Sequence, residues 1–267
     1  MKKKSIILYI ILSVSIVTAL YGLTKPKPII SVITSLYKGE EFIEEFLQDI
    51  TRQTIFDKCE LIIINANSPE NEEPIIKKYM KHYPNIRYRK LDFDPGIYGV
   101  WNMAVHMAQG EFLTNANVDD RFSPNLYEKH LDMLLKHPEV DLVYSDFLET
   151  QKPHETFECN TATHRSRWPE YYPGLIRKCN PPHCFPMWRK SIHEKCGYFD
   201  AHYKNAGDWD MWLRAETAGS IFKKVDGIHC LYYRNPTGLS SDDTRMRQIY
   251  GEIVEIRNKY GIVKNTA

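Results

Sequence analysis

Residues 110–121 read Gly-Glu-Phe-Leu-Thr-Asn-Ala-Asn-Val-Asp-Asp-Arg. Gly110 marks the end of an expected helix, because glycine readily takes the positive φ that ends many helices. A short strand is expected next, and it delivers Asn117, Asp119 and Asp120 at its carboxyl end. Ligands bind at that edge of open α/β sheets. Two carboxylates and a carboxamide there suit a hard cation and the hydroxyl groups of a nucleotide sugar.

Hydrophobic periodicity on both sides of this stretch predicts alternating strands and helices. Strands are expected at 29–34, 60–64, 86–91, 111–115 and 140–144, with helices at 40–51, after Ser68, from Gly96 to Gly110 and at 124–136. This alternation predicts a Rossmann-like, mostly parallel sheet that is flanked by helices. Right-handed crossovers then bring the loops 65–68 and 117–120 to one edge.

The periodicity is lost over 149–180, which we expect to be ordered but irregular because it is rich in aromatic residues. Beyond this segment, strands are expected at 185–189, 221–225 and 228–234 and helices at 191–196, 208–218 and 240–260.

The N-terminus carries an apolar segment. Residues 5–23 contain no charged side chain and follow three lysines. Such a run predicts one transmembrane helix that anchors the chain in a membrane. The alternative is a signal peptide cleaved after Val17-Thr18-Ala19. Lys2 to Lys4 slightly outweigh Lys25 and Lys27, which favours an outward-facing domain, but the side of the membrane stays open.

Composition narrows the possible partners. The 267 residues are 43% hydrophobic and 26% charged, and the formal net charge is +1. A balanced charge argues against nucleic acid as a partner. Among the six cysteines and their neighbours, the set Cys179, His183, Cys184, His193 and Cys196 invites a zinc hypothesis, but its spacing fits no standard finger. Buried free thiols or one disulfide are favoured instead.

Five segments together resemble the family 2 glycosyltransferases, which have the A-type, nucleotide-sugar-binding α/β fold. They lie at 30–53, 61–68, 96–111, 117–120 and 207–214, within a likeness that spans roughly 28–240. Asn117-Val118-Asp119-Asp120 is similar to that family's Asp-x-Asp-Asp pattern. Gly207-Asp208-Trp209-Asp210 is similar to the start of its Glu-Asp-x-Asp-x-Trp-Leu-Arg helix. Asn at 65, 67 and 117 and Gly at 207 depart from the pattern.

The residue patterns predict an anchor or signal peptide at 1–24, a linker at 25–28 and a C-terminal helix at 241–267. The resemblance implies a glycosyltransferase domain at 29–240. Within the domain, 29–148 would be the nucleotide-sugar half and 149–240 the acceptor half.

Sugar transfer from a nucleotide diphosphate needs a counter-charge for the departing phosphates. Mn²⁺ or Mg²⁺ supplies it, bound by few carboxylates, and we expect Asp119 to hold the metal with help from Asp120. The acceptor hydroxyl must lose a proton, and Asp208 is the expected general base. The resemblance implies the same base and inversion at the anomeric carbon. For each of these acids the competing role is a helix cap.

The remaining site residues are expected to contact the two substrates. Donor-binding candidates are Asn65, Asn67, Ser68, Asn102, Asn117, Asp119 and Arg234, the last through a closing loop. Acceptor-binding candidates are His183, Trp188 and Trp209, because flat rings suit sugar faces, although core packing competes for each Trp. The acceptor itself would be a glycan, a lipid-linked molecule or a protein.

Two other functions stay open. A catalytically silent protein that binds nucleotide sugars or glycans would fit the asparagines that replace aspartates. A different nucleotide-dependent enzyme, such as a nucleotidyltransferase, is the third hypothesis. The absence of GxGxxG and GxxxxGK[ST] patterns argues against dinucleotide and P-loop chemistry.

Overall fold

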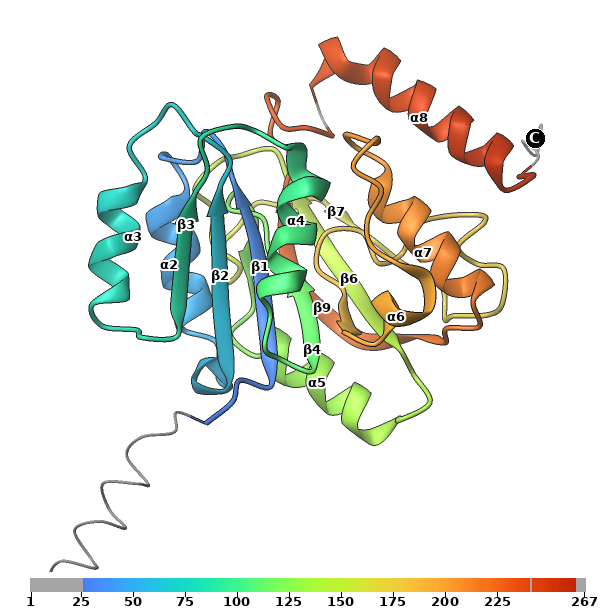
Figure 1. Ribbon diagram of the computed structural model, residues 1–267, viewed down its shortest axis with the longest axis horizontal. Coiled ribbons are helices and arrows are strands. Elements are labelled where there is room, and N and C mark those ends of the chain that lie inside the picture. Colours follow the sequence, from blue (N-terminus) through green and yellow to red (C-terminus); the bar gives the residue numbers. More distant parts are fainter. Residues whose placement is uncertain (1–25, 241, 263–267) are drawn as a thin grey trace, which may run out of the picture.

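The first β-branched run forms the strand at the centre of one half of the molecule, β1 (Ile30–Leu36). The computed structural model describes residues 26–240 and 242–262. β1 pairs in parallel with β2 (Cys59–Asn65) and with β4 (Phe112–Asn115), and β3 (Ile86–Lys90) pairs in parallel with β2. The parallel sheet predicted for this half is therefore confirmed (Figure 1).

The prediction of a mostly parallel sheet is wrong for the other half, where the sheet is mixed. β8 (Met187–Arg189) lies between β4 and β6 (Leu142–Thr150) and is antiparallel to both. The chain reaches β8 through an irregular segment that contains only the short β7 (His164–Arg165), which pairs with β6. No crossover helix precedes β8, so nothing imposes the parallel direction that such a helix would. The sheet order is β3-β2-β1-β4-β8-β6-β9-β5.

One bent strand replaces the two strands expected at 221–225 and 228–234. β9 (Phe222–Tyr233) runs parallel to β6, with register shifts opposite residues 145–147. Gly227 has a φ of +106°, which allows the chain to kink at this bulge. β9 also pairs with β5 (Arg121–Phe122), a strand that the sequence did not predict. The pairing brings the residues after β9 to the acidic cluster before β5.

Helices cover both faces of the sheet, and side chains along the strands alternate between two cores. On one face lie α2 (Ile43–Thr51), α3 (Glu73–Met80) and α5 (Leu126–Lys136), which pack with Leu61 and Ile63. On the other face lie α4 (Gly96–Met107), α6 (Ile192–Cys196), α7 (Gly207–Thr217) and α8 (Met246–Lys259), which pack with Ile62 and Ile64. The period of two is that of a strand buried on both faces. Single 3₁₀ turns occur at Phe56–Lys58 and Asp243–Arg245.

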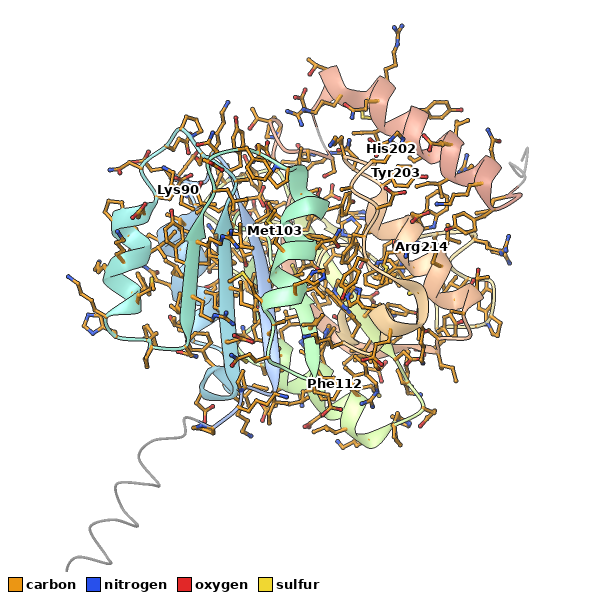
Figure 2. The ribbon with its side chains drawn as sticks, in the orientation of Figure 1. Lys90, Met103, Phe112, His202, Tyr203 and Arg214 are labelled. Carbon is orange, nitrogen blue, oxygen red and sulfur yellow. The ribbon has the colours of Figure 1, made fainter. Side chains whose placement is uncertain are left out.

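The two edges of the parallel half are marked by labelled residues in Figure 2. Lys90 ends β3 at the carboxyl edge, whereas Phe112 begins β4 at the amino edge. The predicted membrane anchor lies outside the described residues. None of the helices within 26–240 and 242–262 is long and apolar enough to cross a bilayer.

Candidate active site

The carboxyl edge gathers the two polar loops that the sequence analysis placed together. Asn65 at the end of β2 is in register with Leu36, and Asn115 at the end of β4 is in register with Ile33 of the same strand β1. Val118 also lies 3.2 Å from the position that a Cβ on Gly39 would take, so the loop after β1 lies against the acidic loop. The shared edge is therefore confirmed.

The loop after β2 is shaped by its own side chains. Asn65 is buried and accepts the N–H of Ser68 at 2.7 Å, and the Ser68 hydroxyl donates to Glu72 at 2.6 Å. Lys38 donates its N–H to the Ser68 hydroxyl at 3.0 Å, which ties this loop to the loop after β1. Asn67 is exposed and has a φ of +58°, a conformation that asparagine tolerates. Of the predicted nucleotide contacts in this loop, Asn67 is the side chain that faces outward.

The two aspartates of the acidic loop have different surroundings. Asp119 is partly accessible, and one of its oxygens accepts from Asn235 Nδ2 at 3.2 Å. Asp120 is fully buried and accepts from Asn117 Nδ2 at 3.0 Å and from the Tyr233 N–H at 3.2 Å. Burial raises the pKa of both carboxyl groups, and the charge of Asp119 further raises that of Asp120. Asp120 thus holds the loop to the end of β9, and Asp119 is the one of the two acids that stays partly accessible.

A pair of thiols lies beneath Asp120. Ligand atoms of Asp120, Cys184 and Cys230 lie within 4.8 Å of one another, and all three residues are buried. Burial raises the pKa of the Cys230 thiol to about 11, so it stays protonated at neutral pH. Within the described chain this is the only such grouping, so the zinc set centred on Cys179 and His193 is not assembled. All six cysteines are free thiols, and three of them, Cys59, Cys184 and Cys230, are buried as expected.

The predicted base, Asp208, lies in the first turn of α7 and is held from two sides. Asn180 Nδ2 donates to one oxygen at 2.8 Å, and the Tyr98 hydroxyl lies 3.2 Å from the other. Burial raises the pKa of Asp208, while the hydrogen bonds from Asn180, from the main chain and from Tyr98 partly offset the rise. A carboxylate with a raised pKa is a better proton acceptor, as a general base requires.

The segment 180–184 connects the base with the acidic loop. Asn180 at its start donates a hydrogen bond to Asp208, and the thiol of Cys184 at its end lies within 4.8 Å of the Asp120 carboxylate. His183 between them has a φ of +43°, which is strained for this residue type, and its ring stacks on Phe147 at 4.8 Å. Burial lowers the pKa of His183 to about 4, so the ring is neutral at physiological pH. Of the predicted acceptor residues, His183 is the one between the two acids.

Three predicted site residues are placed elsewhere, which corrects the sequence analysis. Trp188 is fully buried and donates to His193, so it cannot line an acceptor pocket. Trp209 is almost fully buried and donates to the carbonyl of Ile176, which also assigns it to the core. Asn102 bonds the main chain of Phe199 through both its amide nitrogen (2.8 Å) and its amide oxygen (3.0 Å), which uses the groups expected to bind donor.

Arg234 is exposed and forms an ion pair with Glu149 at 3.5 Å. Its neighbour Asn235, rather than Arg234 itself, contacts Asp119. Asn180, Tyr98 and Asn235 were not among the predicted site residues. They lie in loops or on a helix face, where the local sequence pattern does not indicate which distant residue each side chain contacts.

The C-terminal helix α8 holds the start of α7. The Glu252 carboxylate is buried and accepts the N–H groups of residues 204, 205 and 206 at 2.9 to 3.0 Å. An anion there also complements the positive end of α7. Further along, Lys259 and Tyr260 bond Asp210 of α7 at 2.8 and 2.9 Å. His202 and Tyr203, labelled beside α8 in Figure 2, bond Glu255.

We expect Glu252→Ala to lower the free energy of unfolding by about 2 to 3 kcal/mol, because it leaves three main-chain donors without their charged acceptor. Denaturant titration measures this change. Glu255→Ala on the same helix is the control, since this side chain is half exposed and its loss should cost less than about 1 kcal/mol. Equal losses for both variants would remove Glu252 from this role.

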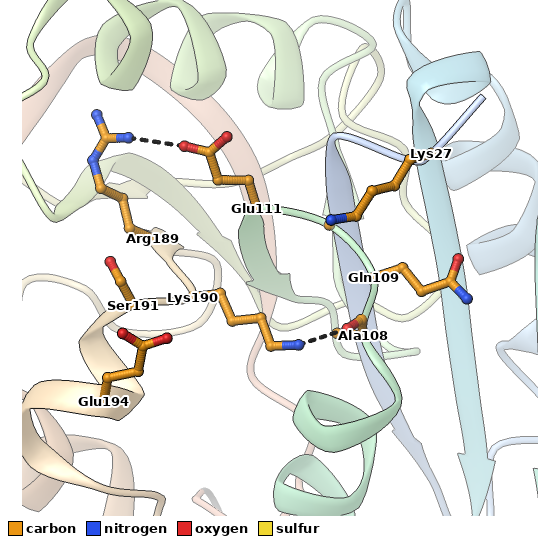
Figure 3. A pocket seen from close by; sticks show the side chains of 9 residues that line it. Lys27, Ala108, Gln109, Glu111, Arg189, Lys190, Ser191 and Glu194 are labelled. Carbon is orange, nitrogen blue, oxygen red and sulfur yellow. Dashed lines mark hydrogen bonds and ion pairs between the residues drawn. The ribbon is translucent and has the colours of Figure 1, made fainter.

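Two hollows lie at the amino edge, away from this site. One, of about 700 Å³, is lined by residues that include Lys27, Glu111, Arg189 and Lys190 (Figure 3). Another, of about 860 Å³, lies beside Pro26, Phe56 and Tyr83. In the first, Arg189 bonds Glu111 and Lys190 bonds the carbonyl of Ala108, so these cations are already engaged. Neither hollow contains a predicted site residue.

The curated relatives of this chain include two in which only part of the protein aligns with it. It is 34% identical over 116 residues to the minor teichoic acid biosynthesis protein GgaB of Bacillus subtilis (strain 168), which is 42% of this chain and 13% of that protein. It is 23% identical over 234 residues to chondroitin synthase of Pasteurella multocida (strain Pm70), or 87% of this chain and 23% of that protein. The chain thus spans less than a quarter of either relative.

Solved structures share the fold. TarS 1–349 of S. aureus in complex with UDP-GlcNAc aligns with a TM-score of 0.68 at 19% identity, covering 86% of this chain and 65% of that one. The mannosyltransferase PcManGT of Pyrobaculum calidifontis in complex with GDP-Man and Mn²⁺ aligns with a TM-score of 0.65 at 17% identity, covering 88% and 64%. These likenesses agree with the expected A-type fold. Residues 31–195, more than half of the chain, match the family described as Glycosyl transferase family 2. The chain belongs to that family.

Proposed function

We propose that this chain transfers a sugar from a nucleotide diphosphate donor to an acceptor hydroxyl, with inversion at the anomeric carbon. One observation carries the proposal. The segment 180–184 joins an acid with a raised pKa, Asp208, to the Asp119–Asp120 loop at the carboxyl edge of the sheet. Transfer between two bound substrates needs a base for the acceptor and a site for the donor diphosphate, held in a fixed arrangement. The segment 180–184 holds the proposed base and the proposed metal-binding loop together.

In the proposed reaction, Asp208 accepts the proton of the acceptor hydroxyl. The hydroxyl oxygen forms a bond to the anomeric carbon, and the bond from that carbon to the diphosphate oxygen breaks, so the diphosphate leaves with the electron pair. Attack from the face opposite the leaving group inverts the configuration. Asn180 and Tyr98 donate to Asp208, and both donors favour the carboxylate form that accepts the proton.

The residues at the acidic loop fit a hard divalent cation. Asp119 offers a carboxylate at the accessible edge, and Mg²⁺ or Mn²⁺ is typically held by one or two carboxylates together with substrate phosphates. Burial raises the pKa of both thiols beneath Asp120, so they are protonated, and soft sulfur ligands do not suit such an ion. We therefore assign the metal to Asp119, with Asp120 supporting the loop. When bound, the cation would neutralise charge on the departing diphosphate.

Donor recognition would come from the loops that flank Asp119. Asn67 is available to the base or ribose, and Asn65 and Ser68 shape the loop that presents it. Asn117 supports this site indirectly through Asp120. Arg234 would reach the diphosphate by leaving Glu149, which is a small cost because exposed ion pairs are weak.

A donor screen tests the function. We expect one nucleotide sugar at about one hundred times its dissociation constant to raise the melting temperature by about 5 to 10 °C in the presence of Mn²⁺. The corresponding sugar without its nucleotide is the matched control and should produce no shift. If no UDP- or GDP-sugar stabilises the chain with either metal, the proposal fails.

The catalytically silent alternative gives a different result in the same screen. A donor would bind, but no nucleotide diphosphate would be released over hours with any acceptor class. The asparagines that motivate this alternative have structural partners here. Asn117 Nδ2 donates to the buried Asp120, and an aspartate at 117 would instead place a second negative charge 3.0 Å away. This contact favours the enzyme.

We also propose that residues 1–24 anchor the domain to a membrane, on the basis of their uncharged apolar run. The linker that follows would join them to the glycosyltransferase domain at 29–240. The acceptor would be a glycan, a lipid-linked molecule or a protein. Fractionation of cells after carbonate extraction tests the anchor, and release of the full chain into the soluble fraction would contradict it.

A further inference from the structure

The Tyr98 ring packs directly against Gly207, in the space that a side chain at position 207 would otherwise occupy. A Cβ built on Gly207 would lie 2.7, 2.8 and 3.0 Å from the Tyr98 ring atoms Cε2, Cδ2 and Cζ. Carbon atoms do not approach this closely, so any larger residue at 207 would displace the ring. The position where the family pattern has Glu is therefore occupied here by the ring of a tyrosine from α4.

The Tyr98 ring is fixed by aromatic neighbours. It is 3% exposed, packs edge-on against Trp101 at 5.4 Å and stacks with Phe199 at 5.9 Å between ring centroids. Its hydroxyl lies 2.7 Å from the carbonyl oxygen of Asn205 and 3.2 Å from Asp208 Oδ1. One phenol proton is thus shared between the main chain before α7 and the carboxylate in its first turn.

We infer that Tyr98 is a positioning residue for Asp208, in the room that Gly207 leaves. The inference rests on the proposed function, in which Asp208 is the base. Tyr98 orients one carboxylate oxygen, and Asn180 holds the other at 2.8 Å. Burial raises the pKa of Tyr98, and the neighbouring carboxylates of Asp208 and Glu252 raise it further. The phenol therefore stays protonated and remains a donor while Asp208 is ionised.

Tyr98→Phe tests the contact, because it removes the hydroxyl and keeps the ring. Removing a donor to a carboxylate raises the pKa of that carboxylate. We expect the Asp208 titration, followed by carboxyl ¹³C NMR of the full chain and assigned with Asp208→Asn, to move to higher pH. Turnover should fall by about tenfold to a hundredfold through loss of alignment, with donor KM changed less than about twofold.

Tyr171→Phe is the matched control. Tyr171 donates to Glu216 at 3.2 Å, the same distance, at the other end of the same helix α7. This variant should leave the Asp208 titration and turnover unchanged. Equal shifts for both variants, or a wild-type titration and turnover for Tyr98→Phe, would overturn the inference. If the wild-type chain turned over no donor, the proposed function would fail, and the NMR titration would still decide whether Tyr98 acts on Asp208.

Gly207→Ala is a second, independent test of the packing between Gly207 and Tyr98. The added methyl group must displace the Tyr98 ring, so turnover should fall at least as far as in Tyr98→Phe. Gly251→Ala on α8 is the control, since nothing lies within 4 Å of the position of its Cβ. Wild-type turnover in Gly207→Ala would contradict the packing on which the inference depends.

Discussion

Asp208→Asn should reduce sugar transfer by about a hundredfold to ten thousandfold, the usual contribution of a general base. An amide has the size of the carboxylate but cannot accept the acceptor's proton. Donor affinity should stay within about threefold of wild type, because Asp208 acts on the acceptor side and Asp119 on the donor side. Initial rates and donor titrations on the same preparation measure both quantities.

The pH dependence of the wild-type rate checks the same residue. Burial raises the pKa of Asp208 above its ordinary value of 3.8. The base works only when ionised, so activity should be lost as pH falls through this raised pKa. The contribution of Asp208 to folding stability has the opposite pH dependence to that of a salt-bridged acid. A raised pKa in the folded state stabilises the fold at low pH, and this stabilisation is lost as pH rises through that pKa. Asp208→Asn should therefore fold at pH 7 as well as wild type.

Asp226→Asn is the control for these measurements, because Asp226 is exposed and lies at the β9 bulge. It should keep the wild-type rate and pH profile. Full activity in Asp208→Asn with normal donor binding would remove Asp208 from the role of base.

Asp119→Asn should abolish the part of donor binding that depends on metal. A neutral amide is a poor ligand for a hard cation compared with a carboxylate. We expect the Mn²⁺-dependent thermal shift with a nucleotide sugar to disappear. Donor affinity in the presence of Mn²⁺ should fall by about tenfold to a hundredfold. Titration of donor with and without Mn²⁺ measures the metal-dependent term directly.

The matched control is Asp57→Asn, an exposed acid at the amino edge of the sheet. It should leave the Mn²⁺ effect unchanged. A wild-type Mn²⁺ effect in Asp119→Asn, in a chain that folds normally, would assign the metal to other residues or show that donor binds without it.

The sequence predicted the parallel half of the fold because its signals are periodic. Runs such as 61–64 alternate between two cores, and the loops after β2 and β4 follow from the ends of those strands. The direction of β8 was not predictable. Three residues carry no directional pattern, and the segment before them contains no crossover helix.

The candidate site was predicted in part. The motif positions Asp119 and Asp208 could be found because acids at a strand end and a helix start are conspicuous against an apolar pattern. Asn180 and Asn235 could not, because each acts through a loop contact across the chain, at 28 and 116 residues of separation. Trp188 was wrongly assigned to the acceptor because an aromatic ring in a sequence looks the same whether it lines a pocket or fills a core.

The asparagines that replace aspartates illustrate the same limit. From the sequence they had no assigned structural role and motivated the hypothesis of a catalytically silent protein. In the structure, Asn65 accepts the N–H of Ser68, and Asn117 donates to a buried carboxylate. The amide at 117 reduces repulsion around Asp120, which sequence spacing alone cannot reveal because it depends on which side chains meet.

The central claim is a single displacement at the anomeric carbon, assisted by Asp208. The most direct test is the configuration of sugar released when water replaces the acceptor. ¹H NMR in the first minutes, before mutarotation, should find the β-anomer from an α-linked nucleotide sugar with wild-type protein and almost no release with Asp208→Asn. Release of the α-anomer, or equal release by the variant, would contradict the account.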